Sequence, residues 1–392
     1  MTYALLSTGF LFVAVLLGVL MARRSGQPGV SWPATAVTLV VLVVLTAVFD
    51  SIMIGLELFS YAPEHISGLV IGLAPVEDFA YPVAIAVALP ALWALLTRRN
   101  AVPMGELVRQ ATAASRPISW INTAFPFAAA MVLTTREVNW VLVVGALYYL
   151  IPYNLAMYGI NDVFDYESDV NNPRKGSIEG ALLPRRFHRP LLWLVLATNL
   201  PFLVVLLLAG GPASWVAITV STFAVVAYSA PGLRLKERPV WDSITSSTHF
   251  VSPAVVGFTL AGGTVEPGVV LVLGSFFLWG MAAHAFGAVQ DIVPDRQAGI
   301  GSIATALGAR GTVRLSLALW ALAGLLVLAA PWPAPLAAVV PVPYLINCAS
   351  SLRVTDTTAA STNRAWRRFI YLNYFAGFLV TLIMIDFWIR MS

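Results

Sequence analysis

Long apolar segments separated by short polar ones run along almost the whole chain. Each approaches the length, about 20 residues, that an α-helix needs to cross a bilayer core of about 30 Å. The pattern therefore predicts an all-α integral membrane protein with about 12 transmembrane helices, arranged as a three-helix N-terminal unit followed by a nine-helix bundle. The predicted helices cover residues 3–22, 34–55, 66–97, 118–135, 139–160, 190–209, 213–230, 244–262, 268–290, 313–330, 334–351 and 368–389.

A polar, basic stretch at residues 98–117, RRNAVPMGELVRQATAASRP, interrupts this pattern most strongly. We interpret it as a cytoplasmic linker between two membrane domains, residues 1–97 and residues 118–392. The first apolar segment begins at residue 3 without a basic region before it or a convincing small-residue cleavage site after it. We therefore expect it to be a retained helix and not a signal peptide.

Composition and charge placement agree with a membrane protein. The 392 residues are 59% hydrophobic and 11% charged, and the charged share of a typical soluble domain is about 25%. If the N-terminus lies outside, 21 of the 23 Lys and Arg residues fall in cytoplasmic segments, and only Arg136 and Arg390 do not. This is the positive-inside distribution of a multi-pass protein of the cell inner membrane. The net charge of +4 therefore needs no nucleic-acid partner, and the single cysteine, Cys348, excludes an intrachain disulfide.

The first polar segment that carries chemistry is NDVFDYESD, which begins at Asn161. If the preceding helix continues through it, Asp162, Asp165 and Asp169 lie at positions i, i+3 and i+7, on one face. Carboxylates at the end of a membrane helix are costly unless something neutralises them. Two polar side chains upstream share that face as possible accessory residues: Asn154 and Tyr158.

A second acidic segment, DIVPD, places Asp291 and Asp295 four residues apart. Gln290 precedes it, and His284 lies two turns earlier on the same stripe. Oxygen-rich clusters of this kind suit Mg²⁺, which takes a few carboxylates together with water and substrate phosphate oxygens. The alternative is that both clusters are solvated charges or Asp–Arg salt bridges at helix ends and bind no ligand.

Basic residues accompany both acidic segments. NNPRKG follows the first and supplies Arg174 and Lys175, and YSAPGLRLK supplies Arg234 and Lys236 after Tyr228. A diphosphate needs such cations as well as metal, because its charge must be stabilised as it leaves. The positive-inside bias explains why some of these basic residues are present. It does not explain why a Tyr-Ser pair and a Pro-Gly turn precede Arg234 and Lys236, which are two residues apart.

In order, NDxxDxxxD, YSxPxxRLK and DxxxD followed by GIGSIATALG resemble the UbiA family of intramembrane prenyltransferases. ASRPISW at 114–120 is similar to that family's entry to its first helix. The resemblance covers roughly residues 110–392. It implies a nine-helix bundle with a central cavity capped by cytoplasmic helices, and Mg²⁺-dependent ionisation of a prenyl diphosphate. Gly232 stands where many relatives have a second proline, which should alter the turn and leave the chemistry intact.

The resemblance also implies roles for the motif residues. The metals would be bound on one side by Asp162, Asp165 and Asp169, and on the other by Asp291 and Asp295. The diphosphate would be bound by Asn161, Arg174, Lys175, Tyr228, Arg234 and Lys236.

The first hundred residues need a separate explanation. APVEDF at 74–79 places Glu77 and Asp78 inside an apolar stretch, where ionisable residues are rare and usually functional. They could instead be a polar pair at a break next to Pro75. The segment FDSIMIGLELFSYAPEHISGLVIGLAPVEDF resembles the small lycopene cyclase subunits, three-helix units that carry PxE(E/D). Those subunits usually work in non-identical pairs, so the resemblance implies a second cyclase subunit as partner.

Together, the two resemblances imply a lycopene elongase joined to a cyclase subunit of fifty-carbon carotenoid biosynthesis. Dimethylallyl diphosphate would ionise between the acidic clusters, and lycopene or a related polyene would attack the allyl cation. Glu77 and Asp78 would then assist ring closure, and His284 or Tyr158 could assist proton removal or serve only in packing. Two alternatives stay open. One is prenylation of an aromatic quinone precursor, and the other is an ion-coupled transporter or assembly factor.

Overall fold

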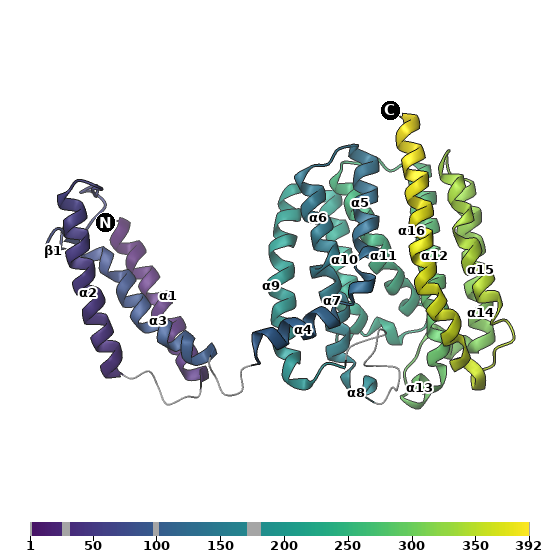
Figure 1. Cartoon of the computed structure of the whole chain (residues 1–392), viewed down its shortest axis with the longest axis horizontal. Coiled ribbons are helices and arrows are strands. Elements are labelled where there is room, and N and C mark those ends of the chain that lie inside the picture. The colour runs from purple at the N-terminus through teal and green to yellow at the C-terminus, as the bar shows by residue number, and fades with distance from the viewer. Residues whose placement is uncertain (1, 26–31, 97–101, 171–181, 392) are drawn as a thin grey trace. The chain divides into compact units, whose positions relative to one another are not determined.

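The computed structural model describes residues 2–25, 32–96, 102–170 and 182–391. The described chain is helical almost throughout and divides into two compact units, Met1–Ala101 and Val102–Ser392 (Figure 1). The all-α membrane class predicted from the sequence is confirmed by these elements and by their apolar composition.

The first unit has three long helices, α1 (Thr2–Ser25), α2 (Trp32–Gly55) and α3 (Ala80–Leu96). Between α2 and α3, the short antiparallel strands β1 (Val70–Ile71) and β2 (Ala74–Pro75) form a hairpin, followed by the 3-10 turn η1 (Val76–Phe79). The helix predicted over residues 66–97 is therefore shorter than expected. Its first part forms the hairpin because Gly72 adopts a positive φ of 67° at the turn.

The second unit begins with the amphipathic helix α4 (Met104–Ala114) and the 3-10 turn η2 (Pro117–Ser119). In Figure 1 its long helices stand side by side, with α4, α8 and α13 at one end of the bundle. The remaining helices are α5 (Ile121–Thr135), α6 (Trp140–Leu150), α7 (Pro152–Phe164), α8 (Tyr166–Asp169), α9 (Arg185–Ala209), α10 (Pro212–Ser229), α11 (Trp241–Leu260), α12 (Pro267–Ala288), α13 (Ile292–Gln297), α14 (Ile303–Leu328), α15 (Pro341–Ala349) and α16 (Asn363–Met391). Four 3-10 turns lie between them: η3 (Leu235–Glu237), η4 (Val289–Asp291), η5 (Ala334–Val339) and η6 (Asp356–Thr362).

Within the described ranges, ten helical segments are long and apolar enough to cross a membrane, against about 12 expected. Two predicted spans, residues 244–262 and 334–351, are not among them, each for a physical reason. α11 is helical where a span was predicted, but it buries polar side chains such as Ser243, Thr245 and His249 inside the bundle. The segment predicted over 334–351 consists of the turn η5 and the nine-residue helix α15.

Two apolar clusters pack the second unit. One includes residues of α4 to α7 and α9 to α11, with Phe127, Tyr149 and Tyr153 among its fully buried side chains. The other joins α12 to α16 around Trp320 and Phe369. The rings of Trp366 and Phe369 stack at a centroid distance of 4.7 Å. The two clusters fix the helix ends that carry the acidic segments.

Candidate active site

Asp162 lies in the last turn of α7, and its side chain is fully buried. A buried carboxylate is costly unless it is paired. The partner is Arg116, whose Nη2 lies 3.1 Å from Oδ1 of Asp162. Arg116 comes from the junction of α4 and η2, where it takes a left-handed φ of 52°. Its guanidinium also lies over the ring of Tyr158, 4.2 Å from the centroid.

Asp165 lies between α7 and α8, so the first acidic segment is not one continuous helix. Its carboxylate forms an ion pair with Lys236 and lies 3.6 Å from Nη2 of Arg234. Both cations follow the Pro-Gly turn after α10, where Gly232 has a φ of 87° and Arg234 a φ of 38°. Arg234 also contacts Glu237, and that hydrogen bond raises the pKa of the guanidinium. The structure thus brings the predicted Asp165, Arg234 and Lys236 together.

Two neighbouring residues at the end of α10 form hydrogen bonds to the first acidic segment and to α12, which precedes the second. Ser229 Oγ donates to Oδ1 of Asn161 at 2.9 Å. The neighbouring Tyr228 has its hydroxyl 3.3 Å from Nε2 of His284, and Oγ of Ser243 lies 3.1 Å from Nδ1 of the same ring. Predicted residues on α7, α10 and α12 are therefore linked through polar atoms.

The second acidic segment lies at the end of α12. Gln290 and Asp291 belong to η4, and Asp295 lies in α13, so a 3-10 turn separates α12 from the helix that carries Asp295. Both carboxylates are half-buried. Oε1 of Gln290 accepts a hydrogen bond of 2.6 Å from Nδ2 of Asn363. In Figure 1, α8 and α13 lie at the same end of the bundle, so both acidic segments lie at that end.

Not every predicted site residue takes part in these contacts. Asn154 is fully buried, and its Nδ2 donates to Oγ1 of Thr123 at 2.7 Å and to the carbonyl of Tyr149 at 2.8 Å. It therefore ties α7 to α5 and α6. Asp169 is the last residue of α8, but its side chain is outside the described part, as are Arg174 and Lys175.

Sequence reasoning gave no site role to several residues that the structure places here. Arg116 had a signal, because it lies within ASRPISW, but its pairing with a carboxylate 46 residues away had none. Asp242 is fully buried and accepts hydrogen bonds from the backbone N–H groups of Ser243 and Ile303, at 2.8 and 2.7 Å. It thereby fixes the start of α14 against α11.

The chemistry of the acidic residues fits Mg²⁺. Among the described residues, no three His, Cys, Asp or Glu side chains gather closely enough to form a complete cage for an ion. Mg²⁺ does not require one, since it is commonly bound through one or two carboxylates plus substrate phosphate oxygens. Asp162, Asp165, Asp291 and Asp295 offer such ligands, and the cations beside the first two offer partners for phosphate oxygens.

The first unit holds a separate polar cluster around η1. Glu77 is buried, and its Oε1 accepts a 2.5 Å hydrogen bond from the N–H of Ser67. Its Oε2 has no hydrogen-bond partner within the described part of the chain. Oδ2 of Asp78 accepts a 2.7 Å hydrogen bond from the hydroxyl of Tyr61. Burial and this hydrogen bond raise the pKa of Tyr61, so its hydroxyl remains a donor. Both carboxylates lie in the turn before α3, at the break next to Pro75.

Comparison with known proteins places these features in a family. Residues 123–375 match the UbiA prenyltransferase family. The C(50) beta-cyclic carotenoids biosynthesis protein LbtBC of Dietzia sp. is 47% identical over 383 residues, which cover 88% of this chain and 89% of that protein. The lycopene elongase/hydratase of Corynebacterium glutamicum is 50% identical over 282 residues, covering 72% and 98%. A solved UbiA homolog from Archaeoglobus fulgidus, bound to DMAPP and Mg²⁺, is 18% identical and covers 68% and 99%, with a TM-score of 0.49.

Proposed function

This chain belongs to the UbiA prenyltransferase family and is a multi-pass membrane prenyltransferase of carotenoid biosynthesis, and we propose that it elongates lycopene. The second unit transfers dimethylallyl groups from dimethylallyl diphosphate to the two ends of the polyene, which gives a fifty-carbon carotenoid. One observation carries this proposal: buried carboxylates are held beside Arg116, Arg234 and Lys236 at one end of the bundle.

The residues of both acidic segments and the basic residues near them have separate roles in this proposal. Mg²⁺ would be held by Asp162, Asp165, Asp169, Asp291 and Asp295, and it would neutralise charge on the leaving diphosphate. Arg234 and Lys236 pair with Asp165 and would bind phosphate oxygens of the substrate. Arg174 and Lys175 are proposed to act with them. These groups stabilise charge that develops in the transition state, where electrostatic stabilisation is most effective.

The reaction is a heterolytic substitution. The C1–O bond of dimethylallyl diphosphate breaks, and the diphosphate leaves with the electron pair. The terminal double bond of lycopene attacks the allyl cation and forms a C–C bond, which leaves a tertiary cation on the polyene. That cation either loses a proton or takes up water, which then releases a proton.

The polyene acceptor is supported by the relatives. The Corynebacterium protein is named a lycopene elongase/hydratase, and 98% of its length is matched. The matched 282 residues are a length that the second unit, Val102–Ser392, can supply by itself. We therefore assign elongation to this unit, in agreement with the family match over residues 123–375.

We further propose that residues 1–97 contribute to ring closure together with a second cyclase subunit. The similarity to the Dietzia protein covers 88% of the chain, more than the 291 residues of the second unit can supply, so it extends into the first. A carboxyl group in an apolar site can protonate an alkene or accept a proton from a carbocation. Glu77 and Asp78 are the candidates for this proton transfer. Glu77 is buried, and its Oε2 accepts no hydrogen bond from the described residues.

The orientation is also a proposal: the N-terminus lies outside, and the acidic segments face the cytoplasm. It is supported by the charge distribution, because this orientation assigns 21 of the 23 basic residues to cytoplasmic segments. In a Cys348→Ser background, membrane-impermeant labelling of intact cells should modify a cysteine at the exposed Pro63 and spare one at the exposed Arg238. The reverse pattern would invert the topology.

Pigment analysis tests the transferase function. The chain is produced in a lycopene-accumulating bacterial host, and the carotenoids are separated and weighed by mass spectrometry. The wild type should yield products heavier than lycopene by one and two five-carbon units, with or without added water. Asp291→Asn should lower the yield at least about 100-fold, because a lost electrostatic contact to the leaving group costs that much.

Asp386→Asn is the matched control, since Asp386 lies near the C-terminal end of α16 and pairs with the exposed Arg390. It should leave the pigments unchanged. Unaltered lycopene from a wild-type protein that is demonstrably in the membrane would contradict the polyene acceptor. Prenylation of a hydroxylated aromatic precursor would then become the activity to measure.

A further inference from the structure

The segment that links α15 to α16 contacts the second acidic segment on both of its flanks. Nη1 of Arg296, the residue directly after Asp295, lies 2.7 Å from Oδ2 of Asp356 at the start of η6. Gln290, the residue directly before Asp291, accepts the 2.6 Å hydrogen bond from Asn363 at the start of α16. One short segment therefore contacts DIVPD immediately before its first carboxylate and immediately after its last.

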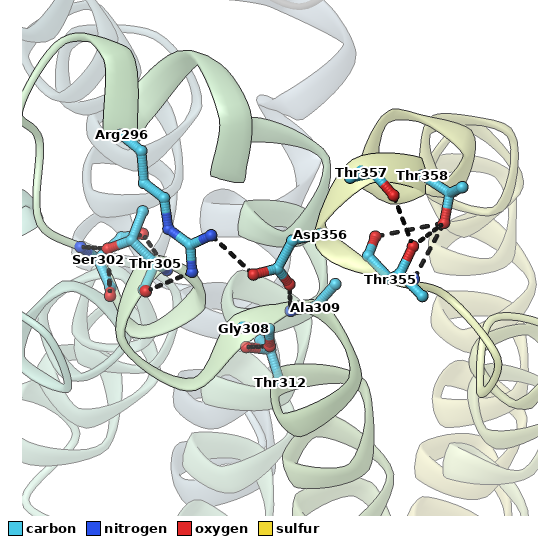
Figure 2. Close-up of polar contacts among 10 residues, drawn as sticks. All are labelled: Arg296, Ser302, Thr305, Gly308, Ala309, Thr312, Thr355, Asp356, Thr357 and Thr358. Atoms are coloured by element: carbon cyan, nitrogen blue, oxygen red, sulfur yellow. Dashed lines mark hydrogen bonds and ion pairs between the residues drawn. The ribbon is translucent and has the colours of Figure 1, made fainter.

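Asp356 is also fixed from its other side (Figure 2). Its Oδ1 accepts a 2.7 Å hydrogen bond from the backbone N–H of Ala309. That N–H is available because Gly308, with φ 69° and ψ 168°, interrupts the helical geometry of α14. A Cβ atom on Gly308 would lie 3.1 Å from Oδ1 of Asp356, so the glycine also makes room for the carboxylate.

Arg296 completes the arrangement in Figure 2. Its Nη2 donates to the carbonyl of Thr305 at 3.0 Å, in the first turn of α14, while its Nη1 holds Asp356. Asp295 itself is tied to the following loop, because its carbonyl accepts a 2.8 Å hydrogen bond from the N–H of Ile300. The guanidinium of Arg296 and the carboxylate of Asp356 thus connect the backbone around Asp295 to α14 and η6.

This arrangement is poorly suited to a role in stability alone. The side chains of Arg296 and Asp356 are 46% and 40% exposed. An ion pair that is this exposed contributes little to folding, because water and salt screen it. Its two backbone hydrogen bonds, however, fix directions, and a ligand displaced slightly from its productive position costs much more in binding than in stability.

We propose that Asp356 is a positioning residue that, through Arg296, holds Asp291 and Asp295 in the geometry needed to bind Mg²⁺ with diphosphate. The inference rests on the proposed function, because it concerns the same metal site. Asp356 touches neither substrate nor metal in this scheme. It acts on the second acidic segment from η6, and it lies outside the sequence motifs to which a role was assigned.

Metal binding by the full chain in detergent tests the proposal without measuring turnover. Unfolding is followed by tryptophan fluorescence on heating, with inorganic diphosphate present, while Mg²⁺ is varied. The Mg²⁺ concentration that gives half of the maximal rise in Tm is compared between wild type, Asp356→Asn, Arg296→Ala, the double variant and the control Asp386→Asn. Loss of a group that orients a metal ligand typically weakens metal binding by about 10–100-fold.

We expect the half-maximal Mg²⁺ concentration to rise about tenfold in each single variant. It should rise no further in the double variant, because both substitutions remove the same Arg296–Asp356 contact. Asp386→Asn should match the wild type, and metal-free Tm values should stay close together. A half-maximal concentration unchanged by Asp356→Asn, while Asp295→Ala abolishes the response, would overturn the positioning role and leave the metal site intact. Additive effects in the double variant would also overturn it. No response in the wild type would overturn the proposed metal site, and this inference with it.

Discussion

Each buried carboxylate of the first acidic segment is matched by its own cation in the structure. Asp162 has Arg116, and Asp165 has Lys236 with Arg234 nearby. Removing one partner of a buried ion pair destabilises the protein by more than the intact pair stabilises it, because the remaining charge is buried without compensation. Of these cations, Arg234 and Lys236 are also the ones that we propose bind the diphosphate. These residues therefore serve both the resting protein and the proposed reaction.

Replacing Lys236 with Met tests this double role. The side chain keeps a similar length but loses its charge, so Asp165 loses this ion pair while Arg234 stays 3.6 Å away. We expect at least about a 100-fold loss in the rate of dimethylallyl transfer. Pigment yield and an assay of diphosphate release would measure this loss. Arg238→Met alters an exposed cation two residues away and should have little effect. Equal losses in both variants would mean that only the general positive charge of this turn matters.

The site was predictable from the sequence as far as local spacing reaches. The sequence alone is enough to recognise the segments NDVFDYESD, DIVPD and YSAPGLRLK. The structure brings Asp165, Arg234 and Lys236 into contact. The partners across the fold were not predictable. Arg116 meets Asp162 through a left-handed turn, and Asp356 meets Arg296 across 60 residues. Such pairings depend on how helices pack, which periodicity along one chain does not encode.

At the scale of elements, hydropathy located almost every helix but missed the breaks. It merged residues 66–97 into one span, although a Gly-turn hairpin and η1 precede α3. It ended the predicted helices at residues 160 and 290, whereas α7 continues to Phe164 before α8, and η4 and α13 follow α12. Apolar composition is insensitive to these changes. They decide which way each carboxylate points.

Close packing of α5 against α11 depends on Gly257. A Cβ atom there would lie 2.4 Å from the carbonyl oxygen of Phe127, a backbone atom that cannot rotate away. We expect Gly257→Ala to lower the free energy of unfolding by about 1–3 kcal/mol, as overpacking does. Gly274→Ala in α12 is the control, because its Cβ would meet only Leu326 at 3.5 Å. Alanine favours a helix by up to about 1 kcal/mol over glycine.

Thermal unfolding in detergent measures both variants. Gly274→Ala should match or slightly exceed the wild type, and Gly257→Ala should unfold at a lower temperature. An unchanged Tm for Gly257→Ala would show that α5 and α11 can separate locally without cost. That result would count against a rigid attachment of α5, which follows Arg116 in the chain.

At the scale of the whole molecule, the chain combines two compact units, each with its own polar cluster. The second contains the residues matched to the family and the two acidic segments with their cations. The first contains the buried Glu77 and the Asp78–Tyr61 pair, close to the hairpin that precedes α3. If each unit has its own reaction, a substitution in one should leave the other reaction unaffected.

Glu77→Gln provides that test. The amide keeps the shape of the side chain but cannot transfer a proton as a carboxyl group does, so ring closure should fail while elongation continues. In a lycopene-producing host that also expresses a candidate partner subunit, the variant should accumulate elongated linear carotenoids where the wild type gives cyclic ones. Glu64→Gln, in the exposed loop before β1, is the matched control and should still give cyclic products. Loss of elongation in Glu77→Gln would show that the two units do not act independently, and the division of labour between them would have to be abandoned.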